Sequence, residues 1–344
     1  MTTTLRDAVL SAVVLLALAS RALPSQAPSH AISRQWMRGT WNTVGNTDRS
    51  SVTFGDIQLL DADNDRLITY DYVDHKVKAV SLTGSLLWQV GEPGLQRGQF
   101  YNVTDLHHDD RGNIWIVDPV PQRITVLSPS GALIRTYEHV PTWLRVAPRS
   151  DGLVWALFPP DGSPGVYDTA GHLHVRPSLS TQLANLRIPA NDLHLSPGSH
   201  DSVLIAYFWA DRFVVLGADG KSPHEFVGIE ARNFPVATRT PRVVAGQSIT
   251  TVGVDSAARP AVLSATWSGA YIYVLPYSQR TAADTSSTID VYRASSGAYV
   301  GSRALPARVI AFSINGDVIA GIIAGPHPTL RVWKWTADSR SAHH

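Results

Sequence analysis

Short apolar stretches separated by tight polar turns follow one another along most of the chain from residue 55 onward. Residues 113–137, NIWIVDPVPQRITVLSPSGALIRTY, contain three such stretches bounded by Pro, Ser and Gly. Runs of this length, rich in β-branched and aromatic residues, are typical of strands. No long window shows the 3.6-residue period of an amphipathic helix, and a short helix is expected only at 180–188. The pattern predicts an all-β chain.

The outline of this stretch recurs along the chain, which indicates a repeat. Gly84, Gly131, Gly171 and Gly220 occupy the same hairpin turn in four copies. Five further copies of the stretch are found, the last two weaker than the others, at residues 66–91, 153–175, 203–226, 270–301 and 317–335. Four antiparallel strands per repeat of this length are typical of a β-propeller blade, which buries both faces only by stacking against neighbouring blades. We therefore expect a six-bladed β-propeller over residues 55–336.

Two regions lie outside this template. The sixth copy lacks a fourth strand, and residues 39–45 of the N-terminal segment 28–54 are expected to supply it, which closes the ring and leaves no open edge. Residues 228–261 contain two expected strands, at 241–245 and 249–254. This region is interpreted as an insertion between blades four and five, and a degenerate seventh blade is the alternative.

Residues 1–27 have the pattern of a secretory signal peptide. Arg6 precedes an apolar run over residues 8–19, and small residues follow. The run is shorter than the ~20 residues that a membrane-spanning helix needs. We expect a cleaved signal, a secreted or periplasmic mature chain without a membrane span, and a disordered tail at 337–344; an uncleaved anchor is the alternative.

Composition narrows the possible functions. The chain has 29 Lys and Arg against 28 Asp and Glu, so no excess of basic charge indicates a nucleic-acid partner. Cysteine is absent, which excludes disulfides, thiolate nucleophiles and cysteine-bound metals. The sequence also lacks the Gly-x-Ser-x-Gly, His-Glu-x-x-His, phosphate-loop and dinucleotide-binding motifs. These absences favour a binding module over an enzyme.

Residues 91–137 resemble an NHL repeat, with a Gly-x-Phe segment, an Asp-x-x-Gly-Asn core, an Arg-Ile pair and a final Gly turn. The matching positions are Gly98, Phe100, Asp109, Gly112, Asn113, Val117, Asp118, Arg123, Ile124 and Gly131. The resemblance, which extends over about residues 55–335, implies a secreted bacterial six-bladed propeller of the NHL-like kind. It also implies that Asp118 and Arg123 are a structural pair linking the second and third strands, with Asp71 and Lys76 as the pair in blade one.

Candidate binding residues lie on the innermost strands, which converge at the axis where propellers usually bind ligands. The segments TDLHHDD and NDLHLSP place His107 and His194 at matching positions of blades two and four, and Arg145 is the expected counterpart in blade three. Two imidazoles and a guanidinium facing one funnel could hold an anion or a metal. Asp105 and Asp192 complete the candidate set. The alternative is that all of these residues serve blade packing.

Two kinds of enzyme remain as alternatives that the family resemblance implies. Amidating lyases of this fold use several histidines with a Tyr and an Arg, and gluconolactonase-like propellers hold a divalent cation with Glu, Asn and Asp. A metal site would need a third ligand, and the expected matching positions in the other blades hold Gln58, Ala265 and Ala311. We therefore expect no cofactor, with a divalent metal as the alternative, and no catalytic residue is identified.

The sequence as a whole predicts a monomeric binding or scaffold propeller that recognises a small polar ligand, a glycan or a protein partner on one face of its ring. A metal-assisted lyase or hydrolase acting in the axial funnel is the alternative.

Overall fold

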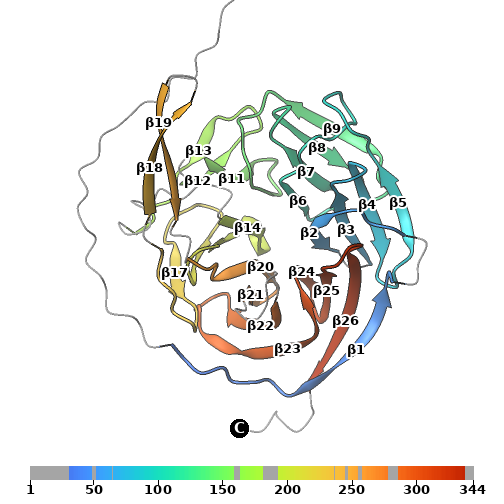
Figure 1. Cartoon of the computed structure of the whole chain (residues 1–344), viewed down its shortest axis with the longest axis vertical. Coiled ribbons are helices and arrows are strands. Elements are labelled where there is room, and N and C mark those ends of the chain that lie inside the picture. Colours follow the sequence, from blue (N-terminus) through green and yellow to red (C-terminus); the bar gives the residue numbers. More distant parts are fainter. Residues whose placement is uncertain are drawn as a thin grey trace, which may run out of the picture.

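The structure is an all-β propeller with six blades, as the sequence predicts. The computed structural model describes residues 31–48, 52–63, 65–158, 163–180, 193–235, 237–244, 247–254, 258–277 and 286–337. Six four-stranded antiparallel sheets stand around one central axis (Figure 1). The innermost strand is the first strand of its sheet in five blades and Ala311–Asn315 in the sixth (Figure 1).

The blades follow one another in chain order. Blade one contains β2 (Ile57–Ala62), β3 (Arg66–Asp71), β4 (Lys76–Ser81) and β5 (Leu86–Val90). Blade two contains β6 (Asp105–His108), β7 (Ile114–Asp118), β8 (Arg123–Leu127) and β9 (Leu133–Glu138). Blade three contains β10 (Val146–Pro148), β11 (Val154–Phe158), β12 (Ser163–Tyr167) and β13 (Leu173–Val175).

The second half of the ring is built in the same way. Blade four contains β14 (Leu193–Pro197), β15 (Val203–Tyr207), β16 (Arg212–Leu216) and β17 (His224–Val227), with a 3-10 turn η2 (Ser199–Asp201) after β14. Blade five contains β20 (Val262–Ser268), β21 (Tyr271–Pro276), β22 (Ser286–Arg293) and β23 (Tyr299–Val309). Blade six contains β24 (Ala311–Asn315), β25 (Val318–Ile323), β26 (Thr329–Ala337) and β1 (Gly39–Asn46).

The hydrophobic core lies between blades. All five residues of β7, of β8 and of β15 are buried, because these middle strands are covered on both faces. In one cluster, Trp155 of blade three packs with Leu195 and Ile205 of blade four. Full burial of a side chain of this size contributes roughly 1.5–3 kcal/mol. A blade therefore needs two neighbours, and the ring supplies them.

The N-terminal segment closes the ring, which confirms the predicted closing strand. β1 pairs antiparallel with β26, with Trp41 opposite Trp335. Before β1, the chain runs beside blade five, where Trp36 forms a parallel bridge with Ser302. After the bulge in β1, Gly45 lies so close to blade one that a Cβ there would be 1.8 Å from the Leu82 carbonyl oxygen. Residues 31–48 therefore link blades five, six and one.

Asp118 and Arg123 both fasten the chain segment that leads into blade two. The Asp118 carboxylate accepts hydrogen bonds from the backbone N–H groups of Tyr101 (2.8 Å) and Asn102 (3.2 Å). The Arg123 guanidinium donates to the carbonyl oxygens of Leu95 and Gln96 at 3.1 and 2.8 Å. The two side chains are 3.9 Å apart and nearly fully buried. Their contacts are all within the fold.

The corresponding pair in blade one differs from the prediction. Asp71 forms its ion pair with Lys78, at 2.7 Å, and not with Lys76. Lys76 is the backbone partner of Asp71 across β3 and β4. Lys78 lies two residues further along the same face of β4, where its side chain is 5% exposed, and a lysine buried there requires an anionic partner.

The insertion between blades four and five forms a separate two-stranded sheet. Its strands are β18 (Ala237–Val244), which begins earlier than predicted, and β19 (Gln247–Val254). They pair only with each other, and the hairpin lies at the periphery of the ring (Figure 1). Almost all of the predicted helix at 180–188, the leader at 1–27 and the tail after residue 337 lie outside the described residues. Within the described part of the chain, no helix is long and apolar enough to cross a membrane.

Loss of the Arg34 guanidinium should weaken ring closure. Arg34 donates to both carboxylate oxygens of Asp290 at 2.9 Å and to Glu230 at 2.6 Å, and the Asp290 side chain is only 2% exposed. We expect Arg34→Gln to lower the free energy of unfolding by about 2–3 kcal/mol, because the buried Asp290 carboxylate loses its cationic partner and keeps, among the described residues, only the hydrogen bond from Ser302 Oγ. Denaturant unfolding followed by tryptophan fluorescence measures this loss.

The matched control is Arg331→Gln, which breaks a more exposed ion pair with Asp48. It should cost less than about 1 kcal/mol. Equal losses for the two variants would contradict the role assigned to Arg34.

Candidate functional site

A cavity of about 1640 Å³ runs along the propeller axis. Its walls include residues from both ends of the inner strands, such as Gln58 near the start of β2 and Asp63 just after its end. The cavity is therefore as long as these strands. Ligand sites of globular proteins commonly occupy concave spaces of this scale.

The inner strands have a free edge that faces this cavity, because each of them pairs with only one strand of its own blade. At four blade junctions, a side chain of one blade accepts a hydrogen bond from an inner-strand N–H of the next blade. The four bonds are Asp61 with His108 N (2.7 Å), Asp105 with Val146 N (2.8 Å), Ser196 with Trp267 N (3.0 Å) and Ser313 with Ala62 N (2.9 Å). Polar side chains thus pair backbone groups that would otherwise lack a partner.

At the two remaining junctions, a side chain also forms a hydrogen bond with the backbone of the neighbouring blade, but through other atoms. Between blades three and four, Arg145 Nε donates to the Leu193 carbonyl oxygen at 3.2 Å, and its Nη1 donates to the Thr104 carbonyl oxygen of blade two. Between blades five and six, Ser268 Oγ accepts from Gly316 N at 3.1 Å. Each of the six junctions therefore contains a bond from a side chain to a neighbouring backbone. We call these bonds the axial ring.

The predicted equivalence of His107 and His194 is wrong by two residues. His107 pairs with Trp115 on β7, whereas the residue that pairs at the same level of blade four is Ser196, opposite Leu204. His194 pairs with Ala206 and thus corresponds to Asp105, which pairs with Val117. Both histidines follow an Asp-Leu pair in the sequence, but in the structure His194 lies two residues away from the level of His107.

Arg145 also lies at the level of Asp105 and not at that of His107. The Arg145 carbonyl accepts from Leu157, which occupies the position of Val117 in blade three. Asp105, Arg145 and His194 consequently form one layer of the cavity wall over blades two, three and four. Asp192 lies outside the described residues.

The charge of each residue in this layer follows from its neighbours. Burial, together with the Arg145 cation, lowers the pKa of His194 to about 4, so its imidazole is neutral at physiological pH. The Nε2 atom of His194 is buried without a hydrogen-bond partner among the described residues. Asp105 and Arg145 are both engaged in the axial ring. The alternative prediction, that the candidate residues serve packing between blades, therefore agrees with the contacts of Asp105 and Arg145.

His107 is bound to Asp105 on its own strand. Its Nε2 lies 3.3 Å from Asp105 Oδ1, close enough for an ion pair but without the alignment of a hydrogen bond. Burial opposes a charge on this imidazole, but the carboxylates of Asp105 and Asp61 outweigh it and raise the pKa of His107.

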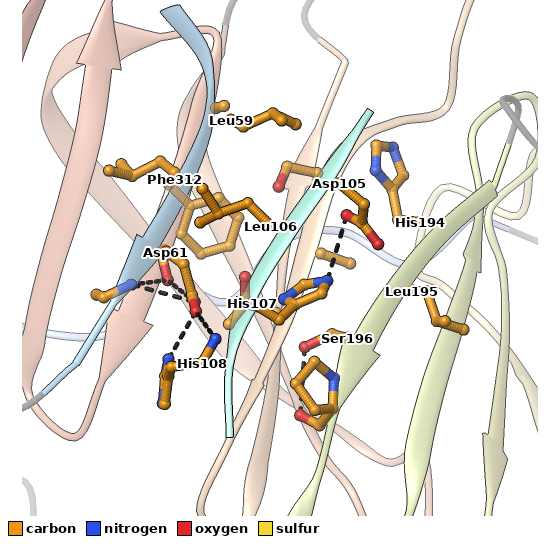
Figure 2. Close-up of a pocket in the computed structure, with 18 of the residues that line it drawn as sticks. Leu59, Asp61, Asp105, Leu106, His107, His108, His194, Leu195, Ser196 and Phe312 are labelled. Atoms are coloured by element: carbon orange, nitrogen blue, oxygen red, sulfur yellow. Dashed lines mark hydrogen bonds and ion pairs between the residues drawn. The ribbon is translucent and has the colours of Figure 1, made fainter. Parts of the chain in front are cut away.

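His108 and Asp61 form a second pair, which is not among the site residues predicted from the sequence. Figure 2 shows the Asp61 carboxylate turned towards His108, and Asp61 Oδ2 lies 2.6 Å from His108 Nδ1 and 2.7 Å from its backbone N. Burial disfavours the Asp61 anion, but the contacts with His108 prevail and lower the pKa of Asp61. The Asp61 anion in turn raises the pKa of His108 to about 9. Because Nδ1 is occupied, Nε2 is the ring atom left for another partner.

The sequence does contain a signal for this pair. Adjacent side chains of a strand point to opposite sides, so His108 must face blade one if His107 faces blade three. The 47-residue offset between blades one and two then places Asp61 opposite His108. The register differs from this offset by one residue, because β2 has a bulge between Ile57 and Leu59: Asp61 pairs with Ile68 and lies at the level of His107, where Gln58 had been expected.

The described residues contain no group of three or more His, Asp or Glu side chains arranged to hold a metal ion. They also do not form a Ser–His–Asp triad around His108. Ser313 Oγ lies 3.4 Å from Asp61 Oδ1, on the carboxylate rather than on the imidazole that a nucleophile would need as its base. The arrangement is suited to binding and to proton donation from a fixed imidazole.

Comparisons with known proteins bear on the fold. No protein-family model and no curated protein matches the chain. A putative exported protein from Bacteroides fragilis superimposes with a TM-score of 0.50 at 8% identity, covering 90% of this chain and 98% of its own. Virginiamycin B lyase from Staphylococcus aureus gives 0.49 at 10%, over 86% and 99% of the two chains. The Cps50 (Swd1) β-propeller domain from Myceliophteria thermophila gives 0.47 at 12%, over 86% and 100%. The 8% identity of the exported protein indicates similarity of fold alone.

The Asp61–His108 pair should make stability depend on pH. The pKa of His108, about 9 in the folded chain, is above the value of about 6.5 expected when it is unfolded. The stabilisation is therefore complete below about pH 6.5 and is lost as the pH rises towards 9. We expect the loss of stability in His108→Gln, relative to wild type, to shrink by about 2 kcal/mol between pH 6 and 9.5.

Denaturant unfolding at a series of pH values measures this difference. His172→Gln is the control, because it breaks a histidine–aspartate ion pair of the same kind, with Asp168 at 2.9 Å, in which the imidazole side chain is 79% exposed; it should cost little stability. A pH-independent difference between wild type and His108→Gln would contradict the ion pair.

Proposed function

We propose that the protein is a binding propeller that holds a small polar ligand, such as a saccharide or an organic acid, in its axial cavity. The observation that carries the proposal is the combination of a cavity of about 1640 Å³ with a wall whose polar side chains are fixed by the axial ring. A wall that is already ordered loses little conformational entropy when a ligand binds.

The lining also offers apolar surface. Phe208 and Trp267 line the cavity between its polar groups, and both are partly exposed. The Trp267 ring lies against Gly198, where a Cβ would be only 2.3 Å from the ring. An aromatic ring beside carboxylates and imidazoles is a combination suited to polyhydroxylated ligands, whose C–H faces pack on rings while their hydroxyls form hydrogen bonds.

We further propose that the chain is exported through its N-terminal leader, acts as a monomer and belongs with NHL-like propellers. The leader pattern at 1–27 and the repeat at 91–137 support these statements. The net charge of +1 argues against nucleic acid as the partner.

A lyase or hydrolase acting in the same cavity is the second candidate. The observation in its favour is the His108 imidazole, which Asp61 holds in one orientation, as acid–base catalysis requires. A metal-assisted reaction would need a further ligand beside His107 and His194, and the described residues supply no such group. Binding alone requires no group beyond those present, and we therefore place it first.

Narrowing the cavity should abolish binding. Ser264 of β20 is partly exposed and lines the cavity. We expect Ser264→Trp to weaken binding of any cavity ligand by at least about tenfold, because the indole occupies ligand space, while Ser264→Ala should bind like wild type. Calorimetry with a panel of neutral and acidic monosaccharides, dicarboxylates and dipeptides measures this.

The proposal is contradicted if ligands of the panel bind Ser264→Trp as tightly as wild type. It is also contradicted if no member of the panel binds the wild-type protein saturably.

A further inference from the structure

We infer that the end of the axial cavity beside His108 binds a carboxylate or phosphate group of the ligand, with His108 Nε2 as the donor and Asp61 as the residue that positions it. The inference rests on the proposed binding function and specifies the chemistry of the ligand. It is based on the contacts between Asp61 and His108 and on the partners of the other charged groups around them.

Asp61 is itself held firmly, so that it can fix the imidazole. It lies largely buried between blades six, one and two, where its Oδ1 accepts from Ala62 N at 3.1 Å and lies 3.4 Å from Ser313 Oγ. Its Oδ2 contacts both the backbone N and Nδ1 of His108. These contacts leave the His108 ring one orientation and one free nitrogen.

That nitrogen is available to a ligand. The His108 side chain is 30% exposed and lines the cavity. Among the described residues, no hydrogen bond is made by its Nε2. An imidazolium N–H donates a charge-assisted hydrogen bond, which is roughly twice as strong as a neutral one when the acceptor is an anion.

The carboxylates near His108 are already occupied. Asp63 is paired with Arg66 at 2.9 Å. Asp109 Oδ1 accepts from the backbone N of Arg111 and of Asn113, and its Oδ2 accepts from Asn113 Nδ2 and Trp115 Nε1, at 2.9–3.1 Å. These carboxylates therefore do not take the Nε2 proton of His108.

Two exposed residues complete the charges at this end. Asp110 and Arg111 are adjacent in sequence, line the cavity and carry opposite charges. The Arg66 and Arg111 cations offset Asp63 and Asp110, and His108 offsets Asp61. Asp109 has no cationic partner among the described residues and is held by four N–H donors instead, so the carboxylates at this end exceed the cations by one. The positive groups left to an incoming anion are His108 and the exposed Arg111.

The other basic groups of the wall are less suitable as donors. His107 Nε2 is turned towards Asp105. Arg145 donates to two backbone carbonyls of the axial ring. His194 is neutral at physiological pH because burial and Arg145 lower its pKa. Arg66 donates to Asp63 and to the Pro129 carbonyl oxygen. The exposed Arg111 is a second cationic donor at this end, and His108 differs from it in that Asp61 fixes the orientation of its ring.

The test is nitrogen NMR of the histidine rings in the wild-type protein, titrated separately with acetate and with inorganic phosphate. We expect at least one of the two anions to shift the Nε2 signal of His108 saturably and to raise its apparent pKa further, because a bound anion favours the imidazolium. The two titrations distinguish a carboxylate from a phosphate as the preferred group. No saturable shift at His108 with either anion would overturn the inference.

Variants provide a second readout. His108→Gln should weaken anion binding by about tenfold or more, which corresponds to loss of one charge-assisted hydrogen bond, and His107→Gln should leave binding within about threefold of wild type. Asp61→Asn should weaken binding more at pH 8 than at pH 6, because the pKa of His108 falls when the carboxylate is neutralised. Anion binding that is unchanged in His108→Gln would overturn the inference.

The outcome is separable from that of the proposed function. Suppose that a neutral sugar binds wild type but not Ser264→Trp, and that neither anion shifts the His108 signal. The cavity would then be the ligand site as proposed, and the inference of an anion site at His108 would be wrong.

Discussion

The free inner edge of each blade is the constraint on which the rest of the propeller depends. An innermost strand pairs with one neighbour only, so its other backbone groups face the axis. Blades six, one, two and four meet this constraint with Ser313, Asp61, Asp105 and Ser196, whose oxygens accept from the inner strand of the next blade. An unpaired edge is otherwise open to water or to another chain. The polar character of the cavity wall is thus first a requirement of the fold.

This requirement also shapes the site. Asp61 pairs the backbone N–H of His108 and, with the same oxygen, holds its imidazole. In the anion site that we propose, stability and ligand recognition are therefore coupled at this residue, whereas His108 Nε2 itself takes no part in the axial ring. Binding side chains that rest on such support keep their geometry without a ligand, which reduces the free-energy cost of binding.

Repetition made the fold predictable from the sequence. The hairpin glycines and apolar runs gave the number of blades, and the missing outer strand of blade six identified β1 as the closing strand. The site was less predictable, because residue type does not determine strand level. His194 follows the same Asp-Leu pattern as His107, yet its register places it opposite Ala206, at the level of Asp105. Lys76 and Lys78 lie on the same face of β4, and the buried Lys78 is the one that forms the ion pair with Asp71. The level of a residue on its strand and its ion-pair partner both depend on packing between segments that are distant in sequence.

Native-state hydrogen exchange at the inner strands tests the central claim most directly. The amides of Ala62, His108, Val146 and Trp267 are the donors of the axial ring at four junctions. If neighbouring side chains hold them, these amides should exchange only through global unfolding, with the free energy that denaturant unfolding gives. Exchange through local opening, at free energies far below the global value, would show that the inner edges are open to water and would contradict the account.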